Sequence, residues 1–183
     1  KLTITPGIQT VYNSEFGEFF LPGLDLNMVI NNNLSAFANV GKTFRTPTFT
    51  DLYYQSRTNI GNELLQPEIA LSGEAGLRYL KNGMSIQASY FFRNGTDIID
   101  WTKENNIDPW QPTNLTELNT SGVDAEFDFT FATLLDKEKS IIKSLRIGYT
   151  YLNSNVVENN TVISKYALEN LENQENTTIT LQY

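Results

Sequence analysis

The strongest pattern in this sequence is an alternation of apolar and polar residues with a period of two. It is clearest in residues 122–131, GVDAEFDFTF, where the odd positions are apolar and Asp124, Glu126 and Asp128 stand at even positions. Because successive side chains of a strand point to opposite faces, this pattern predicts β-strands with one apolar and one polar face. We therefore expect an all-β chain built from antiparallel strands.

Comparable runs recur along the whole chain, and several reach the roughly 9 to 11 residues of a tilted membrane strand. Together they predict about eight strands. The expected strands span residues 1–12, 23–30, 34–44, 67–80, 84–93, 122–131, 145–151 and 176–183. Alternation alone leaves two readings open, because the apolar face can contact either a protein core or lipid.

The connections between the expected strands favour the membrane reading. Long connections are expected at residues 13–22, 45–66, 94–118 and 153–175, and short ones at residues 31–33, 81–83 and 132–140. Because long and short alternate, all long loops fall at one end of the sheet, as in outer-membrane barrels, whereas a Greek-key sandwich has no reason to keep this order. Aromatic residues on the apolar face also gather toward both strand ends, as lipid–water interfaces select. They are Tyr12, Tyr90, Phe92, Tyr149 and Tyr151 toward the long loops, and Tyr79, Phe129 and Phe131 toward the short turns.

Composition removes several classes of function. The 183 residues carry a net charge of −8, no Cys and no His. This argues against a nucleic-acid partner and excludes thiol chemistry, Cys/His zinc sites and histidine-based catalysis.

Asp124 and Glu126 lie about 7 Å apart on one strand face, a spacing that an inverting glycosidase accepts, but acids in alternation are more typical of a wetted sheet face. Asp97, Asp100 and Asp108 lack the spacing of a calcium loop. We expect no catalytic residue, metal or cofactor.

Three segments in fixed order resemble the C-terminal part of the barrel in TonB-dependent outer-membrane receptors. They are FRTPTFTDLYY at residues 44–54, GNELLQPE at residues 61–68, and IIDWTKENNIDPWQPTNLTELNTSGVDAEFDF starting at Ile98. The third segment and the stretch KYALENLENQENTTITLQY, residues 165–183, are similar to the cobalamin-receptor-like branch from Bacteroidetes. This chain departs from relatives at Glu172, Asn173 and Gln174, where a basic residue and His are frequent.

The resemblance implies a transmembrane antiparallel β-barrel, of which residues 1–183 supply about eight of roughly 22 strands. We expect the plug domain and the final strands to lie outside this chain. Its first residues, KLTITPG, are typical of the interior of a longer structure, so we expect the chain to be a fragment. The implied function is TonB-energised uptake of a bulky, scarce nutrient across the bacterial outer membrane. A corrinoid such as cobalamin is the first candidate ligand, and a ferric siderophore or haem is next.

The implied partners are the TonB complex, reached through the plug, a small-molecule nutrient, outer-membrane lipid and a surface lipoprotein. Two alternatives stay open. One is a soluble β-sandwich module that binds glycans through loop aromatics. The other is a structural or usher-like barrel without nutrient specificity.

Particular residues are candidates for particular roles. Aromatic side chains on a rigid loop base offer contact area to a bulky ligand, so the candidate ligand contacts are Tyr53, Tyr54, Arg57 and Trp110. Trp101 is expected to anchor its loop at the membrane surface. Structural roles are expected for Phe44, Arg45, Pro47, Gly61, Asn62, Pro67 and Glu68, with Glu68 pairing with Arg45 across the hairpin. The residues expected to face a hydrated lumen are Glu74, Arg78, Asp124, Glu126, Asp128 and Arg146.

Overall fold

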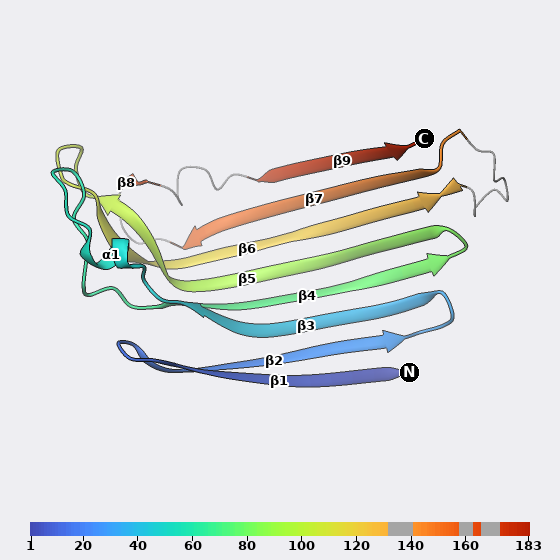
Figure 1. Cartoon of the computed structure of the whole chain (residues 1–183), viewed down its shortest axis with the longest axis horizontal. Helices are drawn as coiled ribbons and strands as arrows, with labels where there is room; N and C mark the ends of the chain where they lie inside the picture. Colours follow the sequence, from blue (N-terminus) through green and yellow to red (C-terminus); the bar gives the residue numbers. More distant parts are fainter. Residues whose placement is uncertain (132–140, 158–162, 166–172) are drawn as a thin grey trace.

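A computed structural model describes residues 1–131, 141–157, 163–165 and 173–183. Its main element is one antiparallel sheet whose long strands lie side by side in the order of the sequence (Figure 1). These strands are β1 (Leu2–Asn13), β2 (Gly17–Val29), β3 (Leu34–Arg45), β4 (Glu68–Lys81), β5 (Met84–Lys103), β6 (Gln111–Thr130), β7 (Ser144–Val157) and β9 (Gln174–Gln182). The short strand β8 (Ile163–Ser164) pairs with β5, and the helix α1 (Phe49–Tyr53) lies between β3 and β4.

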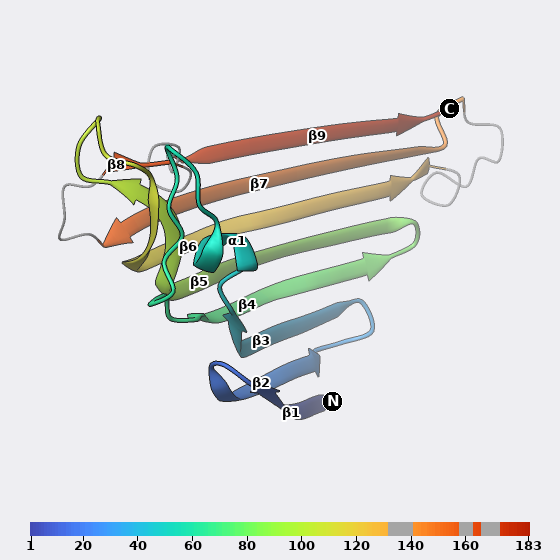
Figure 2. The ribbon, with the colours of Figure 1, turned by 60° about the vertical axis from the view of Figure 1, so that its left-hand side comes forward.

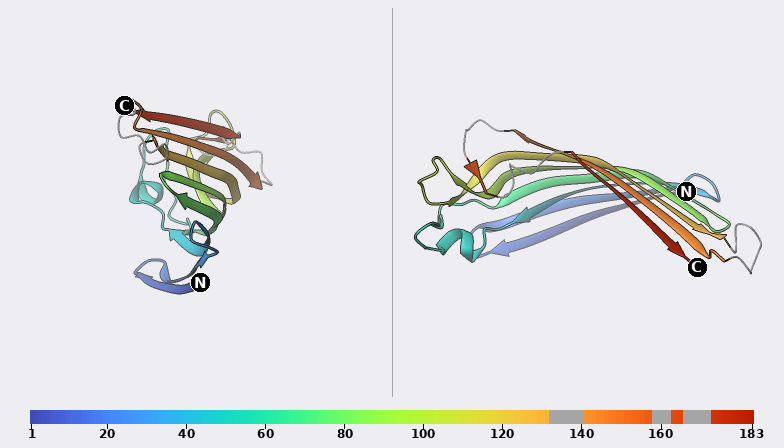
Figure 3. Two further views of the ribbon diagram at one scale, coloured as in Figure 1. Left: turned by 90° about the vertical axis from the view of Figure 1, so that its right-hand side faces the viewer. Right: turned by 90° about the horizontal axis from the view of Figure 1, so that it is seen from above.

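The predicted all-β fold and its long strands are confirmed. Each long strand pairs with the next one along the described part of the chain, without a crossover. This is the up-and-down order of a barrel wall, which differs from the order of a Greek key. Figure 3 shows an open, curved sheet with β1 and β9 at its two edges. Among the described residues, no helix is long and apolar enough to cross a membrane.

The first hairpin differs from its prediction. β1 ends at Asn13 and β2 begins at Gly17, so the turn is tight and the expected long connection at residues 13–22 is wrong. Gly17 has a φ of +82°, which glycine adopts without strain. The Asn13 side chain accepts the backbone N–H groups of Glu15 and Phe16, and such an Asx turn is a local signal that alternation does not reveal.

The expected long loop at residues 94–118 is also wrong over most of its length. β5 and β6 each have 20 residues, and the connection between them covers only residues 104–110. Asp100, Trp101 and Thr102 are buried in succession. Because this stretch is covered on both faces, it has no period-two pattern to read. We call residues 96–117, where β5 and β6 run beyond the other strands, the β5–β6 arm.

The remaining connections follow the predicted order. Figure 1 shows α1, β8 and the tip of the β5–β6 arm at one end of the sheet, and the β2–β3 and β4–β5 turns at the other. The β4–β5 turn contains Asn82 and Gly83, both at positive φ, as a two-residue hairpin requires. The expected short connection at residues 132–140 lies outside the described residues. So do residues 158–162 and 166–172 of the long connection expected at residues 153–175, into which β7 extends as far as Val157.

Strand register gives the sheet one apolar and one polar face. Residues directly opposite each other in an antiparallel pair lie on the same face. Ala88 is opposite Leu77 on β4 and Ala125 on β6, and Asp128 is opposite Arg146. On the apolar face many large side chains are exposed in this chain, among them Leu2, Ile4, Ile8, Leu77, Tyr90, Val123 and Ile179. An exposed apolar surface of this breadth is typical of contact with lipid.

A row in which three of four residues are polar limits this apolar face toward the loops. Register places Lys42, Leu71, Asn94 and Asn119 in one row across β3 to β6. Asn94 follows Met84, at the turn, by ten residues, which corresponds to about 34 Å of strand and about 24 Å of height at a tilt of about 45°. This height suits the apolar band of an outer-membrane barrel, about 25 Å. We call the sheet between this row and the short turns the wall.

One aromatic residue lies elsewhere than expected. Tyr149 is opposite Ala125, which is opposite Ala88. Tyr149 therefore stands in the middle rows of the wall, away from the long loops. The reason is that β7 continues to Val157, beyond the end that alternation suggested, so the distance from Tyr149 to the loops is longer than predicted.

Candidate functional site

The segment FRTPTFTDLYY forms the end of β3 and the helix α1. Pro47 has no backbone N–H and ends strand pairing. Thr48 caps the helix: its hydroxyl oxygen accepts the Asp51 N–H at 3.2 Å, and the Asp51 carboxylate accepts the Thr48 N–H at 3.0 Å. This reciprocal pair is a capping box. The expectation of an irregular loop is therefore wrong here, and the spacing Thr-x-x-Asp was the signal that would have found the helix.

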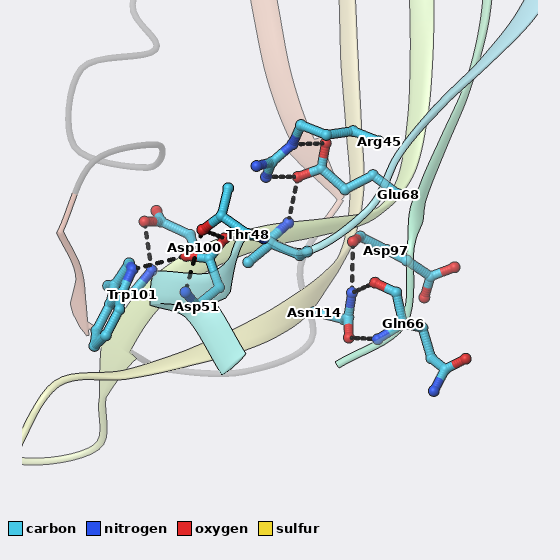
Figure 4. Close-up of polar contacts among 10 residues, drawn as sticks. Arg45, Thr48, Asp51, Gln66, Glu68, Asp97, Asp100, Trp101 and Asn114 are labelled. Atoms are coloured by element: carbon cyan, nitrogen blue, oxygen red, sulfur yellow. Dashed lines mark hydrogen bonds and ion pairs between the residues drawn. The ribbon is translucent and has the colours of Figure 1, made fainter. Parts of the chain in front are cut away.

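Arg45 and Glu68 join the two strands at the base of this connection. Arg45 Nε donates to Glu68 Oε2 at 2.9 Å, and Arg45 Nη2 donates to Oε1 (Figure 4). Glu68 is buried, and its Oε1 also accepts the Ile99 N–H at 2.8 Å. The predicted ion pair is thus confirmed, and it also attaches the base of the loop to β5. Pro67 directly precedes β4, as the predicted strand entry requires.

The rest of the connection, residues 55–67, is hydrogen-bonded to the β5–β6 arm. The Asn114 side chain accepts the Gln66 N–H and donates to the Gln66 carbonyl, both at 2.8 Å (Figure 4). The Asn62 side chain donates to the Pro112 carbonyl at 3.0 Å. Trp110 accepts the Ile60 N–H at 2.9 Å through its carbonyl. These hydrogen bonds therefore attach the long connection to the β5–β6 arm at Ile60, Asn62 and Gln66.

Gly61 has a structural role, as expected. A Cβ atom at this position would lie 2.6 Å from the Leu52 carbonyl oxygen of α1. The Gly61 N–H donates to the Tyr54 carbonyl at 2.6 Å. The chain returns so closely past the end of α1 that only glycine fits without a shift.

Trp101 is not at the membrane surface, so its predicted role as an interfacial anchor is wrong. It is 9 % exposed, and its Nε1–H donates to Asp51 Oδ1 at 3.2 Å (Figure 4). Its backbone N–H donates to Asp100 Oδ1 at 2.7 Å, and the other oxygen of Asp100 accepts the Ser164 hydroxyl. Its carbonyl accepts the Lys165 N–H at 2.9 Å. Three segments, α1, β5 and β8, therefore meet at this residue.

We call α1, residues 55–67, the β5–β6 arm and β8 together the loop assembly. It holds most of the buried apolar residues of the described chain, including Leu52, Leu65 and Ile98. Figure 2 shows α1 in front of the sheet, beside the ends of β5 and β6. The packed core of this chain thus lies at the loop end, where it gives the connections fixed positions.

The structure places Tyr53 and Tyr54 at the end of α1, where both rings are exposed. The Tyr53 hydroxyl donates to Glu15 Oε1 at 3.3 Å, and this carboxylate raises the pKa of the phenol. Phe49, which the sequence did not single out, is 77 % exposed, and its ring centroid lies 4.9 Å from that of Tyr53. Phe49 and Tyr53 are four residues apart on a helix, a spacing that would have revealed the pair once α1 was recognised.

Trp110 and Arg57 lie apart from this aromatic pair. Trp110 is half-buried, and the ammonium groups of Lys103 and Lys165 lie 4.6 and 5.6 Å from its ring centroid. Arg57 is exposed in the turn of residues 56–59. Among the described residues, no hydrogen bond or ring contact joins Trp110 to Tyr53 or Tyr54. The predicted contacts therefore form two groups on the loop assembly, one on α1 and one on the arm.

The residues predicted to line a lumen share the polar face of the wall. Arg146 Nε lies 3.2 Å from Glu126 Oε1 and 2.5 Å from Asp128 Oδ1. Asp124 accepts the Thr150 hydroxyl at 2.6 Å. In the same face Arg78 Nε donates to Gln87, and Glu74 is opposite Asn39 and Phe91. Asp124, Glu126 and Asp128 on β6 thus bond to side chains of β7, and contact with a lumen stays a prediction.

Comparison with known proteins decides the family. Residues 1–181 match the family model described as TonB-dependent receptor-like, β-barrel. The chain belongs to the TonB-dependent receptor family. A curated member, the vitamin B12 transporter BtuB of Vibrio vulnificus (strain YJ016), is 30 % identical over 125 residues, which make up 68 % of this receptor chain and 20 % of that protein.

Solved structures of receptors share the same fold. The siderophore receptor PirA from Pseudomonas aeruginosa has a TM-score of 0.69 at 18 % identity, over 85 % of this receptor chain and 29 % of that one. The siderophore receptor PirA from Acinetobacter baumannii has a TM-score of 0.60 at 12 % identity, over 100 % and 37 %. The copper transporter OprC has a TM-score of 0.58 at 15 % identity, over 77 % and 21 %. This chain therefore spans a fifth of the curated relative and less than two-fifths of these structures.

Family membership confirms the partial transmembrane β-barrel and the outer membrane of a Gram-negative bacterium as its location. The soluble β-sandwich is not supported, because the described strands form a single sheet in sequence order. The family is one of receptors and transporters rather than enzymes.

Proposed function

We propose that this chain is part of a receptor that binds a bulky, scarce nutrient at the cell surface and takes it up with energy from TonB. The observation that supports this most is the loop assembly: connections that are long in sequence are held by hydrogen bonds between segments far apart in the chain, and they carry exposed aromatic rings. A ligand that binds to a rigid surface loses less affinity to the ordering of loops. The chemistry is binding and passage, and no bond is made or broken.

In this proposal the ligand contacts lie on the loop assembly. Phe49, Tyr53 and Tyr54 give contact area on α1 and its C-cap, and Trp110 gives a second aromatic surface on the β5–β6 arm. Arg57 adds a positive charge in the turn of residues 56–59, in a chain whose net charge is −8. Aromatic rings with a few polar groups are the usual lining of sites for small molecules.

The remaining surfaces take the other partners. The apolar face of the wall contacts outer-membrane lipid, because its large side chains are exposed in the chain itself. The polar face, with Glu74, Arg78, Asp124 and Arg146, lines the hydrated interior and faces a plug domain, through which TonB acts. A surface lipoprotein is a further partner expected at the loop assembly.

Cobalamin is the first ligand to test, because the curated relative is named a vitamin B12 transporter. Ferric siderophores are next, because two of the similar structures are siderophore receptors. Haem follows as a third bulky, metal-containing candidate. The ligands differ in charge and shape, so a panel separates them clearly.

The test is an equilibrium titration of the full-length receptor in detergent with cobalamin. We expect saturable binding that the double variant Tyr53→Ala/Tyr54→Ala weakens at least tenfold, since about 1.4 kcal/mol of lost contact corresponds to that factor. Tyr90→Ala is the matched control, because Tyr90 is an exposed tyrosine on the apolar face of the wall. Binding of a siderophore or haem instead would change the ligand, and the absence of binding by the whole panel would contradict the receptor function.

A further inference from the structure

We propose that Trp101 is a positioning residue for the ligand-binding surface on α1. Through its hydrogen bond to Asp51, it holds α1, and with it the rings of Phe49 and Tyr53, in a fixed place against the β5–β6 arm. This inference rests on the proposed function, because it assigns the aromatic pair to ligand binding. Trp101 itself is 9 % exposed and contacts the buried Asp51 of α1. Its effect on ligand binding is therefore indirect and depends on the position of α1.

The first step is that α1 needs support from outside itself. The helix has five residues, and a helix of this length is not stable in water on its own. Its capping box uses Asp51 Oδ2, which accepts the Thr48 N–H at 3.0 Å and the Thr48 hydroxyl at 2.7 Å. The other oxygen, Oδ1, accepts the Trp101 indole N–H. One buried carboxylate therefore both caps the helix and attaches it to β5.

The second step is that Trp101 is itself held on two sides. Its N–H donates to Asp100, which also accepts the Ser164 hydroxyl from β8. Its carbonyl accepts the Lys165 N–H at 2.9 Å. The backbone of Trp101 is thus held within β5 and against the β8 segment, and from this fixed position its indole N–H donates to Asp51 of α1.

The third step is that α1 has two different sides. Asp51 and Leu52 are buried, at 8 % and 5 % exposure, whereas Phe49 and Tyr53 are 77 % and 40 % exposed. The buried side is the one that Trp101 holds. The exposed side carries the aromatic pair, so any rotation or fraying of the helix moves both rings together.

The variant Trp101→Phe tests the link, because it keeps an aromatic ring and removes the indole N–H. In the full-length receptor we expect it to weaken ligand binding about tenfold, the size of one hydrogen bond to a charged group. In a Phe49→Ala/Tyr53→Ala background the same substitution should change affinity less than twofold, because contacting groups are not additive in a double-mutant cycle. An equal loss in both backgrounds would overturn the proposal, since a general weakening of the barrel acts in both.

A second measurement separates the failure of this inference from the failure of the proposed function. Hydrogen exchange of the ligand-free receptor reports the Leu52 and Tyr54 amides, which donate to the Thr48 and Thr50 carbonyls. We expect Trp101→Phe to speed their exchange at least fivefold and to leave the β4 amides unchanged. Trp110→Phe is the matched control for this measurement, and it should leave the α1 amides unchanged.

Ligand affinity and hydrogen exchange at α1 together distinguish the possible outcomes. Faster exchange at α1 with no ligand bound by the panel would support the positioning of α1 and reject the ligand assignment. Unchanged exchange at α1 would overturn the positioning role, whatever the affinity. Faster exchange at α1 and β4 alike would mean that Trp101 supports the barrel generally, and this too would overturn the proposal.

Discussion

The wall and the loop assembly are stabilised in opposite ways. In the wall, the apolar and polar faces follow the period of the strands, and side chains such as Leu77 and Tyr90 are exposed in this chain, where we propose that lipid covers them. In the loop assembly, Asp51, Leu65 and Trp101 are buried by segments that lie far apart in the sequence. The wall thus depends on which face a side chain occupies, whereas the loop assembly depends on specific contacts between single residues.

The strongest test of this comparison places an arginine on one face, and then on the other face, of the same wall strand. Ala88 and Gln87 are neighbours on β5, on the apolar and polar faces respectively. Ala88→Arg should lower the free energy of unfolding in lipid by about 2 to 4 kcal/mol, because an arginine near the bilayer midplane is costly. Gln87→Arg loses the hydrogen bond from Arg78 but stands opposite Glu126 on β6, on a face that we expect to be hydrated, so it should cost less than Ala88→Arg. Equal costs would contradict the assignment of the faces.

The next largest effect compares one acid from each region. Glu68→Gln removes the charge from a partly buried ion pair and turns an amide NH2 group toward the Arg45 guanidinium, which can only donate, so we expect a loss of about 2 kcal/mol. Asp128→Asn breaks an ion pair with Arg146, whose side chain is 60 % exposed, and should cost less than about 1 kcal/mol. Denaturant unfolding of the two variants measures both, and a larger loss for Asp128→Asn would reverse the comparison.

A pair of glycines gives a smaller contrast. Gly61→Ala would place a Cβ atom 2.6 Å from the Leu52 carbonyl oxygen, whereas at Gly148 in the wall the nearest atom, Thr178 Cβ, lies at 4.0 Å. We expect Gly61→Ala to cost about 1 to 3 kcal/mol and Gly148→Ala to stay within about 0.5 kcal/mol. Thermal unfolding of the full-length receptor checks both values, and a neutral Gly61→Ala would mean that α1 is not tightly held.

The smallest expected effect is a change in pKa. The Glu15 carboxylate raises the pKa of the Tyr53 phenol because a neighbouring negative charge disfavours the phenolate. Glu15→Gln should therefore lower this pKa toward the ordinary value for tyrosine. NMR titration of the labelled Tyr53 ring in the parent receptor and in the Glu15→Gln variant measures the change. An unchanged pKa would show that Tyr53 does not approach the first hairpin.

The same contrast explains how far the sequence predicts the structure. The wall strands were predicted because alternation is local, and the Arg45–Glu68 pair followed from the hairpin register. The β5–β6 arm was missed because residues buried on both faces lose the period of two. Trp101 was misassigned because an aromatic residue at a loop base looks the same in sequence whether it contacts lipid or a buried Asp51. The helix α1 was missed although Thr48 and Asp51 signalled it.

The central claim is that the wall crosses the outer membrane with the loop assembly at the cell surface. This chain contains no cysteine, so single cysteines introduced into it report exposure directly once any cysteine elsewhere in the receptor has been replaced. Ile107, 94 % exposed at the tip of the β5–β6 arm, and Asn82, in the β4–β5 turn, lie at opposite ends of the wall. In intact cells, a membrane-impermeant maleimide should label Ile107→Cys and leave Asn82→Cys unlabelled until the outer membrane is opened. Labelling of Asn82→Cys in intact cells, with Ile107→Cys protected, would contradict the orientation and the proposed ligand site together.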